Sequence, residues 1–393
     1  MQNRKNEKHT QKLELQQYTL IIALFVLIVA FQLLSKGKVL TPMNINNLIM
    51  QNSYIVILAI GMLQCILLGG INLAVGSAVA LTGGVGAILI MNYQWPVWAA
   101  IIVIIALGCL IGCFEGFFIA QVGIPAFIVT LADMLILRGL ILVMLKAQTI
   151  GPLPPALTAL GVSHIPAVMV PVPGGNLDMI TITAAVLTAV VIVMLDVIKC
   201  RKNQRIGVQN PPLWQMVVKD LIIIAFAGFF FIKLAQHNGL PVVLIILLLV
   251  ACFYHFYTER TTGGRKVYAV GGNENAAKLS GIAVKKVIFN VYLNCGMLSG
   301  LAGLILIARN ASATPTAGEN FELDAIASCF IGGASTSGGI GTVVGCITGA
   351  FIMGVLNNGM SLMGLSSYWQ RVVKGLVLLG AVTLDLYNKK RAK

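Results

Sequence analysis

The sequence predicts an all-α polytopic membrane protein with about 10–12 transmembrane helices, some of them half-length. Hydrophobic residues make up 58% of the 393-residue chain and charged residues 10%, which leaves too little polar surface to cover a water-soluble globule. Apolar runs of about 20 residues, long enough to span a bilayer core as a helix, recur along the chain. Period-two alternation is missing, which argues against a transmembrane β-barrel.

Twelve apolar segments mark the expected helices, one of them half-length. They are 19–34, 54–69, 73–92, 97–119, 125–146, 179–198, 220–235, 240–258, 287–309, 324–335, 337–360 and 371–388. The first follows a basic tail as a signal peptide would, but Ser35-Lys36-Gly37-Lys38 offers no small-residue cleavage site. We therefore expect it to be retained as a helix in the lipid bilayer.

Basic residues set the predicted topology. The formal net charge of +14 would suit a nucleic-acid partner, but the charges lie in short blocks between apolar runs rather than along one face. The positive-inside rule assigns every block to the cytoplasm, and an even number of spans agrees. Residues 1–18 and 389–393 are thus predicted cytoplasmic tails around one transmembrane domain, 19–388. The blocks are Arg4, Lys5, Lys8 and Lys12; Lys199, Arg201, Lys202, Arg205 and Lys219; Arg260, Arg265, Lys266, Lys278, Lys285 and Lys286; and Lys389, Lys390, Arg391 and Lys393.

Two segments between the spans have unusual composition. Residues 149–178 are too rich in proline and glycine for a long helix and form an outer loop, which either covers an entrance or only links helices. Thr258 to Val287 is polar at both ends. Asn273 can cap a short surface helix there and Gly281 can end it, with Ala276, Ala277 and Leu279 as a small apolar face. Such a helix suits docking into a groove of another protein, and an ordinary loop is the alternative.

Three ionisable residues fall inside predicted helices: Glu115, Asp133 and Arg138. Each costs about 2.5–3.5 kcal/mol at bilayer depth, so each needs a partner or a function. Asp133 and Arg138 lie about 140° apart around a helix, so each is expected to contact a neighbouring helix instead of the other. Structural pairing is the simpler reading. Further carboxylates, Glu319, Glu322 and Asp324, are expected at an outer loop.

Signatures of enzymes are missing. The sequence contains no metal-spaced histidine pair, no GxSxG elbow, no GxxxxGK[ST] phosphate loop, and no disulfide or zinc spacing among its eight cysteines. We therefore expect no catalytic residue, no metal site and no cofactor bound by this chain, so that any coupling to ATP requires a partner.

Four motifs resemble the permease subunits of bacterial ATP-binding-cassette (ABC) sugar importers of the ribose, xylose and multiple-monosaccharide type. They are GGRKVYAVGGNENAAKLSGI, similar to the family's coupling segment; VGIPAFIVTLADMLILRGL, similar to its fifth-helix signature; LLGGINLAVGS, similar to GGxDLSVGS; and ELDAIASCFIGGASTSGGIGTVVGCITGAF, similar to its C-terminal signature. Residues 179–235 resemble the extra helix pair of the longer xylose and multiple-sugar members.

The resemblance implies a ribose-permease type of fold in a bacterial cell membrane, with a second copy of the chain, an ABC ATPase that binds ATP and Mg²⁺, and an extracytoplasmic sugar-binding protein as partners. The implied substrate is a monosaccharide such as xylose or galactose, and a secondary transporter driven by an ion gradient is the alternative. Residues 259–286 correspond to the coupling segment. The ATPase contacts that it implies are Arg265, Tyr268, Gly271, Gly272, Asn273, Ala276, Ala277, Leu279, Ser280 and Gly281.

The chain also departs from the family pattern. Asn72 and Ala74 stand where Asp and Ser are usual, and Glu115 and Asp133 stand where neutral residues are usual. Asn72, together with Glu322 and Asp324 at the expected outer mouth, is a candidate for substrate passage or partner docking. Packing or capping is the alternative role for the two carboxylates.

Overall fold

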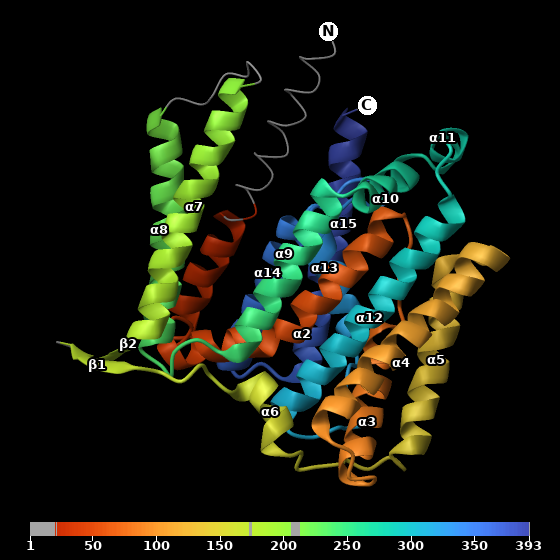
Figure 1. Ribbon diagram of the computed structural model, residues 1–393, viewed down its shortest axis with the longest axis horizontal. Coiled ribbons are helices and arrows are strands. Elements are labelled where there is room, and N and C mark those ends of the chain that lie inside the picture. Colours follow the sequence, from red (N-terminus) through yellow and green to blue (C-terminus); the bar gives the residue numbers. More distant parts are fainter. Residues whose placement is uncertain (1–19, 21, 173–174, 206–212, 393) are drawn as a thin grey trace.

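A computed structural model describes residues 20, 22–172, 175–205 and 213–392 (Figure 1). The predicted tail 1–18 and Lys393 lie outside these residues. Within them, seven helices are long and apolar enough to cross a membrane, and the shorter apolar helices Ile22–Leu34 and Val75–Met91 add to these. The first described helix and α15 (Ser367–Ala392) reach the same end of the molecule, which is also the end where α10 (Thr262–Gly272) and α11 (Glu274–Leu279) lie (Figure 1).

Two long helices form the centre of the protein. They are α2 (Pro42–Leu67) and α12 (Val284–Asn310), whose most apolar stretches are 89% and 78% buried. The helices α3 (Val75–Met91), α4 (Val97–Phe117), α13 (Phe321–Ile331) and α14 (Val343–Leu362) pack around them. Glycine allows the closest contact. Gly108 and Gly112 of α4 lie directly against the α12 backbone, where added Cβ atoms would collide with it.

The outer helices expose apolar side chains that water would not tolerate. These helices are α5 (Ala126–Met144), α7 (Met179–Arg205), α8 (Leu213–Ala235) and α9 (Val242–Arg260). Only 6% of the apolar stretch of α7 is buried, which fits a helix surrounded by lipid. The helices α7 and α8 contact each other and stand at one side of the molecule, as the predicted extra pair, 179–235 (Figure 1).

Each of the twelve predicted segments coincides with a helix, but several boundaries were wrong. The helix α2 begins at Pro42 instead of residue 54, because polar residues such as Asn44, Asn46 and Asn52 are buried inside the protein. Residues 332–342, predicted to be largely helical, form a glycine-rich loop between α13 and α14. The helix α15 continues through the predicted tail to Ala392. A π-helical turn, η1 (Phe118–Val122), extends α4.

The two unusual segments have more structure than composition predicts. The described residues of 149–178 form no long helix, as expected, but include α6 (Pro155–Val162) and a hairpin of β1 (Met169–Val172) and β2 (Gly175–Asp178). The segment from Thr258 to Val287 was expected to form one short helix and forms two, α10 and α11. The predicted cap is present, since the Asn273 side chain accepts a hydrogen bond from the Ala276 backbone N–H at 2.9 Å.

Candidate functional site

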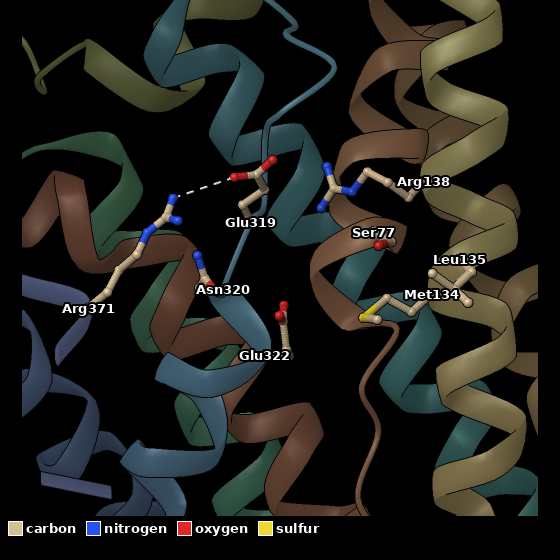
Figure 2. A pocket seen from close by; sticks show the side chains of 8 residues that line it. All are labelled: Ser77, Met134, Leu135, Arg138, Glu319, Asn320, Glu322 and Arg371. Atoms are coloured by element: carbon tan, nitrogen blue, oxygen red, sulfur yellow. Dashed lines mark ion pairs between the residues drawn. The ribbon is translucent and has the colours of Figure 1, made fainter. Parts of the chain in front are cut away.

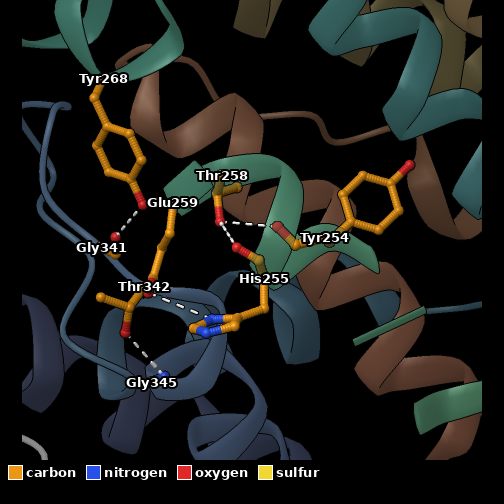
Figure 3. Close-up of polar contacts among 8 residues, drawn as sticks. All are labelled: Tyr254, His255, Thr258, Glu259, Tyr268, Gly341, Thr342 and Gly345. Atoms are coloured by element: carbon orange, nitrogen blue, oxygen red, sulfur yellow. Dashed lines mark hydrogen bonds and ion pairs between the residues drawn. The ribbon is translucent and has the colours of Figure 1, made fainter. Parts of the chain in front are cut away.

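The segment of α10 and α11 has one face against the protein and another in solvent. Tyr268 and Gly271 belong to the inner face. The Tyr268 hydroxyl donates a hydrogen bond to the Gly341 carbonyl at 2.7 Å (Figure 3), and burial raises the pKa of Tyr268 to about 12. Gly271 lies directly against the Leu67 carbonyl at the end of α2, where a Cβ atom would overlap the oxygen. Ala277 is buried as well.

The remaining predicted contact residues point outward. Leu279 is 90% exposed, which is unusual for a leucine outside lipid, and a Cβ atom on Gly272 would meet nothing within 4 Å. The structure therefore divides the predicted ATPase contacts, which the sequence motif does not distinguish, into residues that face the protein and residues that face solvent. Of the predicted residues, those exposed are Arg265, Gly272, Asn273, Ala276, Leu279, Ser280 and Gly281.

Backbone contacts join α10 to two loops of the transmembrane domain. The Gly339 N–H donates to the Leu67 carbonyl at 2.8 Å, and Gly338 and Gly339 also lie against Gly271 and Gly272. Both Gly338 and Gly339 have positive φ, which glycine adopts at no steric cost. The loop continues to Thr342, whose hydroxyl caps α14 by accepting the Gly345 N–H (Figure 3). Displacement of α10 must therefore shift the end of α2 and the start of α14.

A second site lies where α3 and α13 begin. Phe321, the first residue of α13, stacks on Tyr54 with ring centroids 4.7 Å apart, and Tyr54 lies midway along α2. Gly76, in the first turn of α3, lies against the Gly318 carbonyl and the Glu322 carboxylate. Of the three carboxylates expected at an outer loop, Glu319 lies in the loop 311–320 between α12 and α13, whereas Glu322 and Asp324 belong to the first turn of α13.

A pocket of about 230 Å³ lies between these helix starts. Ser77 of α3 lines one side and Met134, Leu135 and Arg138 of α5 line the next (Figure 2). The opposite wall is formed by the α12–α13 loop, α13 and α15, through Glu319, Asn320, Glu322 and Arg371. Arg371 and Glu319 form an ion pair at 3.6 Å (Figure 2). Sequence reasoning selected Glu322 but missed Ser77 and Arg371, because residues so far apart in the chain share no local pattern.

The other candidate carboxylate has a different environment. Asp324 is buried, and its carboxylate accepts a hydrogen bond from the Lys374 ammonium of α15 at 2.9 Å. It is not among the residues that line the pocket. Its predicted role in substrate passage or docking therefore gains no support from the pocket, and its pairing with Lys374 explains how a carboxylate can be accommodated at this depth.

The charges inside α4 and α5 find partners on neighbouring elements, as expected. The Arg138 guanidinium donates to the carbonyls of Pro315 and Ala317 at 2.9 and 2.7 Å. Glu115 accepts a hydrogen bond from the Asn72 amide at 2.5 Å, and the Asp133 carboxyl group lies close to that of Glu115. Asn72, Glu115 and Asp133, which differ from the family pattern, therefore form a single buried cluster.

Comparisons with known proteins extend over almost the whole chain. The family model described as branched-chain amino acid transport system / permease component matches residues 44–196 and 156–382. The xylose transport system permease protein XylH of Escherichia coli strain K12 is 36% identical over 387 residues, which cover 97% of this chain and 94% of that protein. The ribose import permease protein RbsC of the same strain is 35% identical over 384 residues, which cover 98% and 97%. No solved structure matches the chain significantly.

Proposed function

The chain belongs to this family of transport-system permease components, and we propose from that premise that it is the membrane permease of an ABC importer for a monosaccharide. The observation that carries the proposal is its similarity, over nearly its full length, to permeases named for xylose and for ribose. The long apolar helices support a place in the cell membrane. Neither similarity favours an ion-driven secondary transporter. In this proposal the chain carries the monosaccharide across the membrane, and a separate subunit hydrolyses ATP.

The exposed face of α10 and α11 is the proposed docking surface for the ATPase subunit, which binds ATP and Mg²⁺. Its exposed apolar tip, Leu279, together with the small side chain of Ala276 and the open position at Gly272, suits insertion into a groove of a partner. The partly buried Tyr268 and Gly271 and the buried Ala277 act differently. They hold α10 and α11 against the transmembrane domain, so that motion of the ATPase reaches the ends of α2 and α14 through the Gly338–Gly339 loop.

The positive-inside rule gives the orientation of the assembly. The basic segment 260–286 and both chain ends belong to the cytoplasmic side, and the hairpin β1–β2 with α6 belongs to the outer side, where an extracytoplasmic binding protein delivers the sugar. A second copy of the chain completes the permease and the surrounding lipid covers the exposed helices. The apolar exposure of α5, with Leu131, Leu135 and Val143 between 41% and 75% exposed, supports a face that contacts lipid or the second copy.

Uptake of labelled xylose and ribose into vesicles tests the proposal. The vesicles contain this chain with its ATPase and binding protein, and wild type is compared with Gly272→Arg and Gly272→Ala. We expect uptake to require ATP and both partners, to be retained in Gly272→Ala, and to be lost in Gly272→Arg while the permease remains folded, because the space around Gly272 is open within the chain. Flux that persists without the ATPase would overturn the proposal.

A further inference from the structure

The pocket where α3 and α13 begin has the construction of a binding site for a small polar molecule. The first turn of any helix leaves backbone N–H groups without intrahelical partners, and it carries the positive end of the helix dipole. Here two helices begin at one pocket, and each contributes a polar side chain as well. The Ser77 residue is 99% buried from solvent, and its hydroxyl faces the pocket (Figure 2). Glu322, near the start of α13, faces it from the other side.

Contacts within the protein hold these groups in place. The Glu322 carboxylate lies against Gly76 in the first turn of α3, and its oxygens can accept hydrogen bonds from a ligand. Two carbonyls of the 311–320 loop bind one terminal nitrogen of Arg138, so the guanidinium is held at the pocket wall with N–H groups to spare. The pocket is therefore preorganised, with donors and acceptors on opposing walls.

Charge and size narrow the class of ligand. The wall carries two arginines, Arg138 and Arg371, and two glutamates, Glu319 and Glu322, so its formal charge balances. Such a wall favours a neutral molecule with many hydroxyl groups over an anion or a cation. The apolar side chains of Met134 and Leu135 offer a surface for the C–H face of a ring. At about 230 Å³ the pocket lies below the roughly 300–1,000 Å³ of sites for drug-sized ligands, which fits one sugar ring.

We propose that this pocket is a transient binding site for a single monosaccharide on its path through the permease, with Ser77, Arg138 and Glu322 contacting the hydroxyl groups and Met134 lying against the ring. The inference deepens the proposed function and rests on it for the substrate class. It places recognition inside the membrane domain as well as in the binding protein. Binding here is weak, because a site on a path must release the sugar.

The experiment measures binding directly, so that it does not depend on transport. Purified full-length permease in nanodiscs is mixed with xylose, and saturation-transfer NMR reports contact. The test variant Met134→Trp enlarges a partly buried side chain of the pocket lining, and the matched control Leu140→Trp places the same side chain at an exposed position of the same helix, 46% exposed and outside the pocket lining. We expect contact with wild type and Leu140→Trp, and at least a tenfold weaker signal with Met134→Trp.

A second pair of variants tests the polar contact. Ser77→Ala should weaken xylose binding about two- to tenfold, the effect of one hydrogen bond, whereas Ser299→Ala, a buried serine on α12 whose hydroxyl bonds only to Cys295, should leave it unchanged. Equal binding by wild type and Met134→Trp, no contact of xylose with wild type, or contact with leucine but not with xylose would each overturn the inference. Uptake in vesicles, measured separately, decides the proposed function. Normal uptake together with absent binding therefore refutes only the pocket.

Discussion

Replacement of Gly271 by alanine should uncouple α10 from the transmembrane domain. The single added methyl group would overlap the Leu67 carbonyl oxygen and would lie 3.0 Å from the Gly339 nitrogen. Both are backbone atoms, which cannot rotate away as a flexible side chain can. Overpacking of a close-packed site costs about 1–3 kcal/mol, and we expect Gly271→Ala to lie at the upper end, about 3 kcal/mol. The chain relieves the overlap by moving α10 outward, which breaks the Tyr268–Gly341 hydrogen bond that joins α10 to the 332–342 loop.

Thermal unfolding and ATP-coupled uptake in the same preparation measure this effect. The neighbouring Gly272→Ala is the matched control, because its methyl group meets nothing within 4 Å. We expect Gly271→Ala to lower the melting temperature by several degrees and to reduce the sugar transported per ATP hydrolysed, with Gly272→Ala close to wild type in both. Equal melting temperatures and equal coupling ratios for the two variants would refute the assignment of Gly271 to the joint between α10 and α2.

Three further predictions concern buried or capping carboxyl groups. Asn72→Asp places a third carboxyl group beside those of Glu115 and Asp133, so the yield of folded protein should fall. Adding Glu115→Gln to the same chain should restore the yield. A yield that stays low would contradict direct contact between residues 72 and 115. Lys374→Met leaves Asp324 buried without its cation and should cost about 3–5 kcal/mol in unfolding free energy, most of which a second change, Asp324→Asn, should recover. Burial raises the pKa of Asp178, but hydrogen bonds from Thr181 and nearby backbone N–H groups to the Asp178 carboxylate outweigh burial and hold this pKa below its ordinary value. The ionised carboxylate therefore stabilises the fold fully above the unfolded-state pKa of about 3.9, and this stabilisation is lost as the pH falls through the folded-state pKa. Melting curves from pH 7 to 3 should show this acid loss in wild type and less of it in Asp178→Asn.

Sequence reasoning succeeded where one local pattern decides the structure. The apolar runs located a helix for each predicted segment, and Asn273 was recognised as a helix cap from its neighbours alone. It failed where burial depends on distant elements. The start of α2 was missed because Asn44 and Asn358 satisfy each other by paired amide hydrogen bonds across 314 residues, which makes polar residues acceptable in a buried helix.

For the candidate sites too, local sequence patterns predicted some features and only the folded contacts showed the others. The coupling segment could be found from a contiguous motif, but the motif does not distinguish Gly271, which packs on Leu67, from Gly272, which faces open space. The three intramembrane charges could be named from hydropathy, and the need for partners followed from the cost of burial. The partners themselves, Asn72 for Glu115 and two loop carbonyls for Arg138, required the folded arrangement.

The sequence by itself determined that this protein is helical, lies in a membrane and belongs with the ABC sugar permeases, because hydropathy, charge blocks and contiguous motifs are properties of neighbouring residues. Only the tertiary structure decided where the short helices α3 and α13 begin. Their starts depend on glycine contacts between Gly76 and the 311–320 loop, which lie far apart in the chain. The pocket between them exists because helix packing brings Ser77, Arg138, Glu322 and Arg371 together from separate elements.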